Sequence, residues 1–420
     1  MDVISGHQQE TRYECGMWHD AINRANIAVL SILVVSRPNR KDGLHDTCNK
    51  NHWLRQNSLF TGFPMQMLAL IPPWLRSVCR CAFFFVLILL LGHGHAENAT
   101  WASNSNRSPG VKIRPQDEIW LVSTRRLAGS QPSTRQPNVW EFRDQWEAAT
   151  AKDFVAKDTT TALNLFWVHG NHVDANMAVR RGFAVYRELV RDAPTSPIRF
   201  VVWSWPSKKL WRPMRDAKLK AARADLEGYY LARFTSQMDS HSQMAMMGFS
   251  FGPRIITGAL HVINNGKLRS SREATFSTTR RQNVRVVLLA PAMHHNWLLP
   301  NSYHGRAGDM MERLLLFKNS CDRALKLYPL MFAHHSPTAM GRKGVVFKAE
   351  DRGLVKRVQQ FDVADSVGSS HSYSDYVKSP EIMSRIRDFI FLPVPTDVGK
   401  LSSHPSLGQI RVESPVLSAK

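Results

Sequence analysis

A serine between two glycines is the clearest candidate for chemistry in this sequence. The run Gly248-Phe249-Ser250-Phe251-Gly252 follows a short apolar segment and precedes residues whose apolar side chains recur at helical spacing. A serine at a sharp strand-to-helix turn is presented above a sheet, and the glycines let strand and helix approach closely. The pattern therefore predicts a nucleophile elbow with Ser250 as the attacking residue. The alternative is an ordinary turn in which Ser250 caps the helix.

Asp322 is the candidate acid that would complete such a site. A serine hydroxyl attacks well only when a base takes its proton and a carboxylate orients that base. Behind a nucleophile elbow the acid and then the histidine follow along the chain. Asp322 comes just after a predicted strand, 313–317, which places it on a loop at the carboxyl end of that strand. It could instead cap the next helix, and three other carboxylates compete for the role of acid: Asp309, Asp351 and Asp362.

His371 is the candidate base. It lies in a polar loop and is the only histidine between the last predicted strand, 358–363, and the helix expected at 380–391. His334 and His335 are the alternatives, on a less defined segment of the chain. The order Ser250, Asp322, His371 matches the order expected behind a nucleophile elbow.

The oxyanion of the reaction needs two backbone N–H donors. One is expected from Phe251, the residue after the serine. The other is expected from Asn171, on the loop after the strand that ends at Val168, with His172 as the alternative. No metal site is expected, because His294, His295 and His304 lack helical spacing and an acidic partner. The predicted chemistry uses no cofactor.

The elements around these residues alternate between strands and helices. Apolar strands are expected at 118–123, 139–142, 163–168, 198–203, 243–247, 284–289 and 313–317, with weaker candidates at 345–347 and 358–363. Helices are expected at 175–190, 216–238, 254–263 and 380–391. Near-continuous apolar strands between helices indicate an α/β fold, a parallel sheet covered on both faces. The site of such a sheet lies at the carboxyl ends of its strands.

Five segments together resemble a branch of largely uncharacterised bacterial α/β-hydrolases. They are Trp167–Asn171, Ser204–Ser207, Gly248–Gly252, Ser320–Leu325 and His371–Tyr373, in the same order and at comparable spacing. The branch commonly has H-G-Y or H-G-F at 169–171 and G-H-S-M-G at 248–252, so this chain departs from it at both places. The resemblance implies an α/β-hydrolase fold over 118–391, with an eight-stranded, mostly parallel sheet and a serine-hydrolase triad. It supplies no substrate.

The residues before this domain have the pattern of an export signal. Basic residues, the apolar core Ala82–Leu91 and Gly94-His95-Ala96 together predict a signal peptide at 65–96, cut after Ala96. Translation is then expected to start at Met65 or Met67, leaving 1–64 as an extension outside the natural chain or a segment without a fold. The core is too short for an ordinary membrane span, but a membrane anchor at 82–91 is the alternative.

Cleavage after Ala96 also sets the expected boundaries of the remaining segments. Residues 97–117 are expected to be a linker, and 392–420 a C-terminal tail. The protein is expected in the periplasm or outside the cell, or at a membrane if 82–91 is retained. Cys321 is the only cysteine after the cut, so no intramolecular disulfide is expected.

The composition restricts the partners. The chain has 55 Lys and Arg against 34 Asp and Glu, a net charge of +21. Such an excess favours acidic surroundings and leaves contact with an anionic membrane surface open. No nucleic-acid motif accompanies the charge, so no nucleic-acid partner is expected. Nothing in the sequence indicates the oligomeric state.

The predicted function is that of a serine hydrolase. The segments 208–223 and 293–311, which would border the site, are basic and aromatic and contain no long apolar lid. We therefore expect an ester, thioester or amide of a small to medium soluble acyl group, with an anionic group met by Lys208, Lys209 or Arg212. The alternative is a non-catalytic exported protein of this fold that binds a ligand or belongs to the cell envelope.

Overall fold

The structure is a computed structural model, and the residues that it describes all lie in the compact unit Thr100–Lys420. They are 112–127, 129, 132–157, 162–193, 195–269, 284–331, 337–347, 352–392 and 411–412. The predictions for 1–64 and for the signal peptide at 65–96 lie outside these residues, as does most of the linker and the tail. Within the described part, no helix combines the length and the apolar character needed to cross a membrane.

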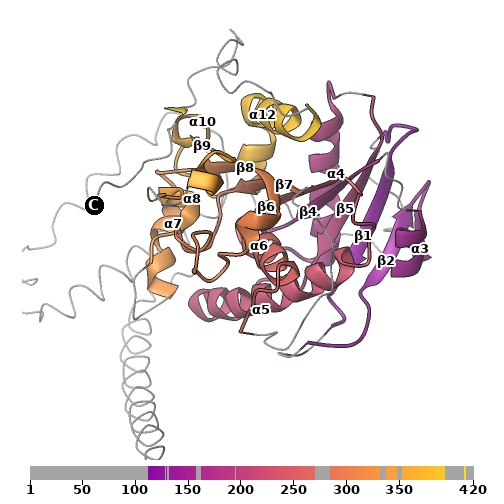
Figure 1. Ribbon diagram of the computed structural model, residues 1–420, viewed down its shortest axis with the longest axis horizontal. Coiled ribbons are helices and arrows are strands. Elements are labelled where there is room, and N and C mark those ends of the chain that lie inside the picture. The colour runs from indigo at the N-terminus through magenta and orange to yellow at the C-terminus, as the bar shows by residue number, and fades with distance from the viewer. Residues whose placement is uncertain are drawn as a thin grey trace, which may run out of the picture. The chain divides into compact units, whose positions relative to one another are not determined.

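One mixed sheet forms the centre of the described residues (Figure 1). Its strands are β1 (Glu118–Ser123), β2 (Asn138–Phe142), β3 (Trp146–Ala149), β4 (Leu163–Val168), β5 (Ile198–Ser204), β6 (Met244–Phe249), β7 (Val284–Leu289), β8 (Met311–Lys318), β9 (Val358–Asp362) and β10 (Arg411–Val412). They lie in the order β10-β9-β8-β7-β6-β4-β5-β1-β2-β3. Every pairing from β1 through β5, β4, β6, β7 and β8 to β9 is parallel.

The mostly parallel sheet was correctly predicted, but its strand count was not. The sheet has 10 strands instead of eight, because antiparallel strands are added at both edges. At one edge β3 pairs with β2, and at the other β10 pairs with β9. Strand β10 lies in 392–420, which was expected to be a tail. Residues 345–347, a weaker strand candidate, form no strand; Val345 and Phe347 are buried as part of a loop, and Val346 is half-buried.

Helices cover both faces of the sheet. The longest are α4 (Ala175–Val190), α5 (Pro213–Thr235), α6 (Gly252–Ile263) and α12 (Pro380–Phe391). Helices α5 and α6 pack on each other along one face, and α4 packs with α12 on the other (Figure 1). Between these layers every residue of β4, β5 and β6 is buried, which explains why these strands have almost no polar alternation.

Short helices occupy the connections. They are α3 (Ala151–Ala156), η2 (Ala307–Met310), α7 (Arg323–Lys326), η3 (Tyr328–Met331), α8 (Met340–Lys343), α9 (Arg352–Val355), α10 (Ala364–Val367) and α11 (Tyr373–Val377). Helices α7 and α10 follow the carboxyl ends of β8 and β9, whereas η2 and α9 lead into the amino ends of these two strands.

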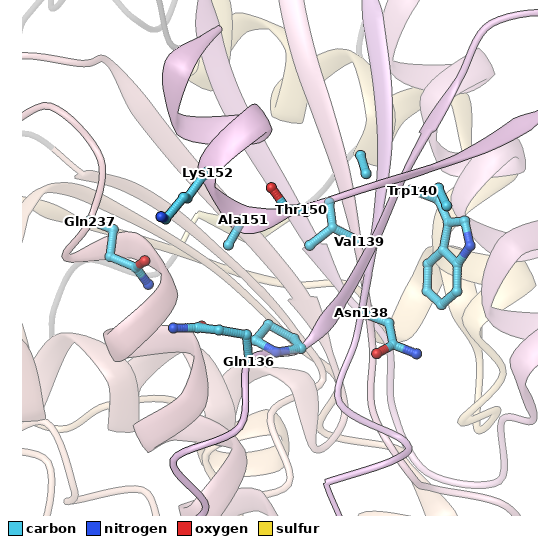
Figure 2. Close-up of a pocket in the computed structure, with 11 residues that line it drawn as sticks. Gln136, Asn138, Val139, Trp140, Thr150, Ala151, Lys152 and Gln237 are labelled. Atoms are coloured by element: carbon cyan, nitrogen blue, oxygen red, sulfur yellow. The ribbon is translucent and has the colours of Figure 1, made fainter.

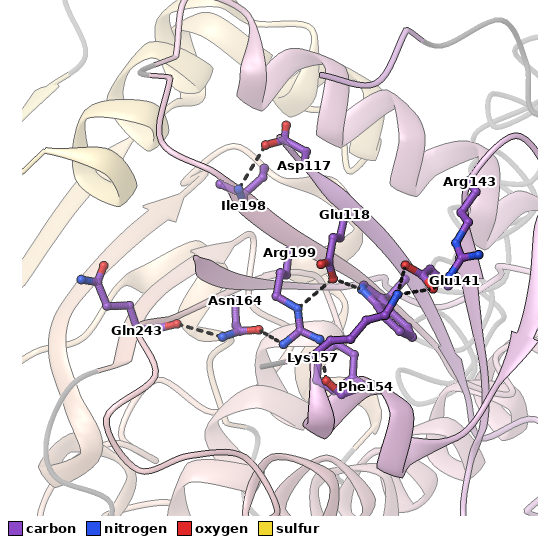
Figure 3. A network of polar contacts seen from close by, with 11 residues as sticks. Asp117, Glu118, Glu141, Arg143, Phe154, Lys157, Asn164, Ile198, Arg199 and Gln243 are labelled. Atoms are coloured by element: carbon purple, nitrogen blue, oxygen red, sulfur yellow. Dashed lines mark hydrogen bonds and ion pairs between the residues drawn. The ribbon is translucent and has the colours of Figure 1, made fainter. Parts of the chain in front are cut away.

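A buried arginine joins three strands and a helix at the opposite, amino edge (Figure 3). Arg199 on β5 donates hydrogen bonds to Glu118 Oε2 at 3.0 Å, to Asn164 Oδ1 at 3.1 Å and to the carbonyl oxygen of Phe154 at 2.6 Å. Its guanidinium also lies 4.1 Å from the centre of the Phe154 ring. A buried charge is stable only with such partners, and here they hold α3 against the ends of β1 and β4.

Candidate active site

Ser250 lies at the turn between β6 and α6. Its φ of 58° is in the left-handed region, which a residue with a side chain adopts only when its surroundings hold it there. Its N–H donates to the carbonyl oxygen of Leu289 at 3.0 Å, and its own carbonyl accepts from the N–H of Ala292 at 2.9 Å. The strained residue is therefore fixed between β7 and the loop that follows it.

The two glycines of the motif are required by close backbone contacts. A Cβ on Gly252 would lie 2.1 Å from the carbonyl oxygen of Val168, and one on Gly248 would lie 2.8 Å from backbone atoms of Gly252 and Pro253. No larger residue fits either position without moving a strand or the helix. The elbow is thus built by the close approach of β4, β6 and α6.

Ser250, His371 and Asp322 form one chain of hydrogen bonds. His371 Nε2 lies 2.9 Å from Ser250 Oγ, and His371 Nδ1 lies 2.6 Å from Asp322 Oδ2. The Asp322 side chain is fully buried, whereas that of His371 is 19% exposed. A base in contact with a serine hydroxyl, and itself oriented by a buried carboxylate, is the arrangement that activates a serine.

Asp322 has both of the roles that the sequence left open. Its Oδ2 faces His371, while its Oδ1 accepts the N–H of Leu325 at 2.8 Å and so caps α7. The cap fixes the carboxylate, which leaves one oxygen directed at the imidazole.

The competing residues lie elsewhere or outside the described residues. Asp362 accepts from Lys318 Nζ at 3.1 Å, and Asp309 accepts from Asn264 Nδ2 at 3.0 Å. Asp351, His334 and His335 lie outside the described residues.

A buried asparagine that the sequence reasoning missed connects the acid loop to the base loop. Asn319 Nδ2 donates to the carbonyl oxygens of Gly368 at 2.8 Å and Ser370 at 3.3 Å, just before His371. Its Oδ1 accepts the N–H of Cys321 at 3.0 Å, just before Asp322. The sequence does show an asparagine directly after a predicted strand. Its bonding partners could not be predicted, because they are 49 and 51 positions away in the sequence.

The loop after β4 lies against Ser250. A Cβ on Gly170 would lie 3.0 Å from Ser250 Cβ and from the carbonyl oxygen of Phe249. Asn171 Nδ2 donates to Asp216 Oδ2 at 3.3 Å, and His172 Nε2 lies 2.8 Å from the same oxygen. Asp216, near the start of α5, thereby holds both residues from which an oxyanion donor was expected.

His169 orients the peptide that follows it. Its Nε2 faces the donors Arg125 Nη2 and the N–H of Trp205, each at 3.3 Å, so Nε2 accepts and Nδ1 carries the proton. Nδ1 then donates to the carbonyl oxygen of Gly170 at 2.9 Å. In a trans peptide the C=O and the next N–H point in opposite directions, so this bond also fixes the N–H of Asn171. Complete burial and the nearby Arg125 charge lower the pKa of His169 to about 3, which keeps it neutral.

The histidines of the segment 293–311 belong to an aromatic cluster. His294 Nδ1 lies 2.7 Å from the hydroxyl of Tyr328, and the fully buried His304 has its Nδ1 2.7 Å from Thr257 Oγ1. The Trp297 ring lies 4.6 Å from His294 and from the guanidinium of Arg254. Among the described residues no three His, Cys, Asp or Glu side chains are placed to hold a metal ion.

A large hollow elsewhere on the described surface is not part of this site. It has a volume of about 580 Å³ and lies beside β2, β3 and α3, with Trp140, Thr150 and Gln237 in its lining (Figure 2). These elements belong to the sheet edge beyond β1, and none of the lining residues comes from the loops around Ser250.

The order of the site residues along the sheet decides the fold type. Ser250 follows β6, Asp322 follows β8 and His371 follows β9, all at the carboxyl edge of parallel strands. A serine elbow followed in the chain by acid and histidine characterises one fold. This is the α/β-hydrolase fold. The fold itself carries many functions, so the activity must be argued from the site.

Comparisons with known proteins give only weak similarities. No protein-family model matches the chain, and no curated protein sequence does. Among solved structures it is similar to the acyl-protein thioesterase 2 of Zea mays, with 14% identity, covering 55% of this chain and 93% of that one, at a TM-score of 0.28. It is also similar to esterase B of Lactobacillus rhamnosis, with 11% identity, covering 66% and 87%, at a TM-score of 0.29. Likenesses this weak assign neither fold nor activity, which rest on the topology and geometry above.

Proposed function

We propose that this protein is a serine hydrolase that cleaves an ester, thioester or amide of a small to medium acyl substrate through an acyl-enzyme. The observation that carries the proposal is the hydrogen-bonded chain from Ser250 through His371 to the buried Asp322. The five segments that resemble a bacterial branch of α/β-hydrolases support it further.

In the first half of the reaction His371 Nε2 takes the proton of Ser250 as its Oγ attacks the carbonyl carbon. Asp322 stabilises the resulting imidazolium, and the N–H groups of Phe251 and Asn171 donate to the new oxyanion. The tetrahedral intermediate collapses with cleavage of the bond to the leaving group, which takes the proton from His371. The acyl group then remains on Ser250 Oγ.

In the second half a water molecule replaces the leaving group. His371 takes a proton from the water as it attacks the acyl carbon, and returns that proton to Ser250 as the ester bond breaks. The products are a carboxylic acid and the free enzyme. No cofactor enters either half.

The proposed substrate is a soluble acyl compound, because the segments 208–223 and 293–311, which we expect to border the site, are basic and aromatic in sequence and contain no long apolar run. An anionic group on the substrate would be met by Lys208, Lys209 or Arg212, which are exposed at the end of the loop after β5. A panel of esters that varies in chain length and charge tests this. Activity that peaks on emulsified long-chain esters, or ignores a substrate carboxylate, would contradict it.

Labelling with a fluorophosphonate probe tests the hydrolase proposal itself. The probe forms a covalent bond only with an activated serine, so we expect one adduct, on Ser250, located by peptide mass spectrometry. Ser250→Ala should abolish the adduct. Absence of labelling in the folded wild-type protein at neutral pH would instead favour the non-catalytic binding function.

A further inference from the structure

A basic segment with an exposed tryptophan follows β5 and leads into α5. Trp211 is 101% exposed and its neighbour Leu210 is 42% exposed, so both apolar side chains face solvent. Exposing them to water is unfavourable. Adjacent large apolar side chains that face solvent often mark an interaction surface. Indole in particular is suited to an interface, since its ring is apolar and its N–H can remain hydrated.

The charges around Trp211 all have one sign. Five exposed cations surround it in the sequence: Lys208, Lys209, Arg212, Arg215 and Lys218. The single acidic residue of the segment, Asp216, is fully buried and faces His172. None of the ion pairs found among the described residues involves one of these five cations. The charged side chains exposed on 208–219 are thus all cationic, and the exposed apolar side chains beside them are Leu210, Trp211 and Leu219.

We propose that the segment 208–219 docks the protein on the surface of an anionic lipid bilayer. The cations contact lipid phosphates and carboxylates, while Trp211 and Leu210 enter the boundary between headgroups and acyl chains. A free anion would satisfy the cations but not the two apolar side chains, and a nucleic acid would be expected to meet more than one aromatic ring. A bilayer surface matches both features at once.

Docking there would turn the candidate site toward the membrane. The segment begins directly after Ser207, whose carbonyl oxygen accepts the N–H of Val173 at 3.2 Å. Val173 ends the loop that starts at Gly170, against Ser250. At the other side of the segment Asp216 holds His172 of the same loop. The inference concerns where the protein acts and does not depend on which bond it cleaves.

Vesicle cosedimentation of the full chain tests the proposal. We expect binding to vesicles that contain roughly a third phosphatidylserine, weak binding to pure phosphatidylcholine vesicles, and loss of binding as salt is raised. Trp211→Ala should weaken binding about tenfold. The triple variant Lys208→Glu, Lys209→Glu, Arg212→Glu should weaken it at least about 100-fold, since each basic residue contributes about fivefold.

A matched control separates local contact from overall charge. The triple variant Lys152→Glu, Lys356→Glu, Lys378→Glu alters three exposed lysines on other elements and changes the net charge by the same amount. It should bind nearly as wild type does. All variants keep residues 1–151 unchanged, so a contribution from the apolar run at 82–91 is common to them. Circular dichroism and unfolding temperature check that each variant is folded.

Three outcomes would overturn the docking proposal. They are equal binding to neutral vesicles, wild-type binding by both Trp211→Ala and the 208–212 triple variant, and an equal loss in the control triple variant. Tighter binding to single-stranded RNA than to the anionic vesicles would replace the membrane with a nucleic acid. Ser250→Ala should bind vesicles as wild type does, so failure of the proposed hydrolysis would leave this result intact.

Discussion

The serine hydroxyl, the imidazole and the carboxylate of the site act as a unit if the proposal is correct. Ser250→Ala should lower kcat on an activated ester by about 10,000-fold or more, and His371→Ala should do so within about tenfold of that. Neither should lower the unfolding temperature greatly, because Ser250 is at a turn and His371 is partly exposed. Retention of turnover by His371→Ala would show that another residue is the base.

A second residue-scale prediction concerns stability in acid. His169 is neutral in the folded protein because burial lowers its pKa to about 3, whereas in the unfolded chain it binds a proton below about pH 6.5. The unfolded state therefore binds more protons between these values, and stability is lost as pH falls through that window. Burial also lowers the pKa of His304, so this histidine likewise makes the folded protein less stable as pH falls.

His169→Asn should reduce this dependence. One histidine contributes a slope of up to about 1.4 kcal/mol per pH unit, so the variant should lose less unfolding free energy between pH 6 and pH 4 than wild type does. Denaturant unfolding at several pH values, with the m-value checked for constancy, measures it. Parallel curves for the two proteins would mean that His169 is not neutral in the fold.

At the scale of elements, the triad depends on how the loops after β8 and β9 are held together. Asn319 donates two hydrogen bonds to the loop after β9 and accepts a third from the N–H of Cys321 in its own loop. Asn319→Ala should lower kcat about tenfold to 100-fold with a smaller change in KM, because the distance from His371 to its partners would no longer be fixed. It should also cost about 1–3 kcal/mol of stability.

Gln360→Ala is the matched control for this variant. Gln360 is also a buried amide, and it bonds the N–H of Val345 at 3.1 Å and the carbonyl oxygen of Val345 at 3.3 Å, away from the triad loops. A similar loss of stability with little change in kcat is expected. Equal losses of kcat in both variants would reduce Asn319 to a general structural role.

At the scale of the whole molecule, the segment before the domain determines where the protein is expected to act. We expect the mature protein to begin at Glu97, after removal of a signal peptide at 65–96. N-terminal sequencing of protein isolated from its native cells decides this. A mature chain that retains 82–91 would support membrane anchoring instead, and one that begins at Met1 would show that 1–64 belongs to the protein.

The sequence by itself determined the features that depend on neighbouring residues. The near-continuous apolar runs of β4, β5 and β6 indicated buried parallel strands, because a strand covered on both faces has no polar side. The two glycines beside Ser250 indicated the elbow, because no other residue permits that approach of backbones. Chain order was enough to nominate Asp322 and His371.

Only the tertiary structure decided which of the nominated residues meet. His371 contacts Asp322 across 49 positions and Ser250 across 121, and such contacts depend on how strands pack, which no local pattern records. Tertiary packing likewise determined the contacts of Asn319 and the edge strands that bring the sheet to 10 strands. It also determined the exposure of Trp211. A tryptophan in a basic segment could equally have been buried against α5. Its position in solvent follows from the path of the chain between β5 and that helix.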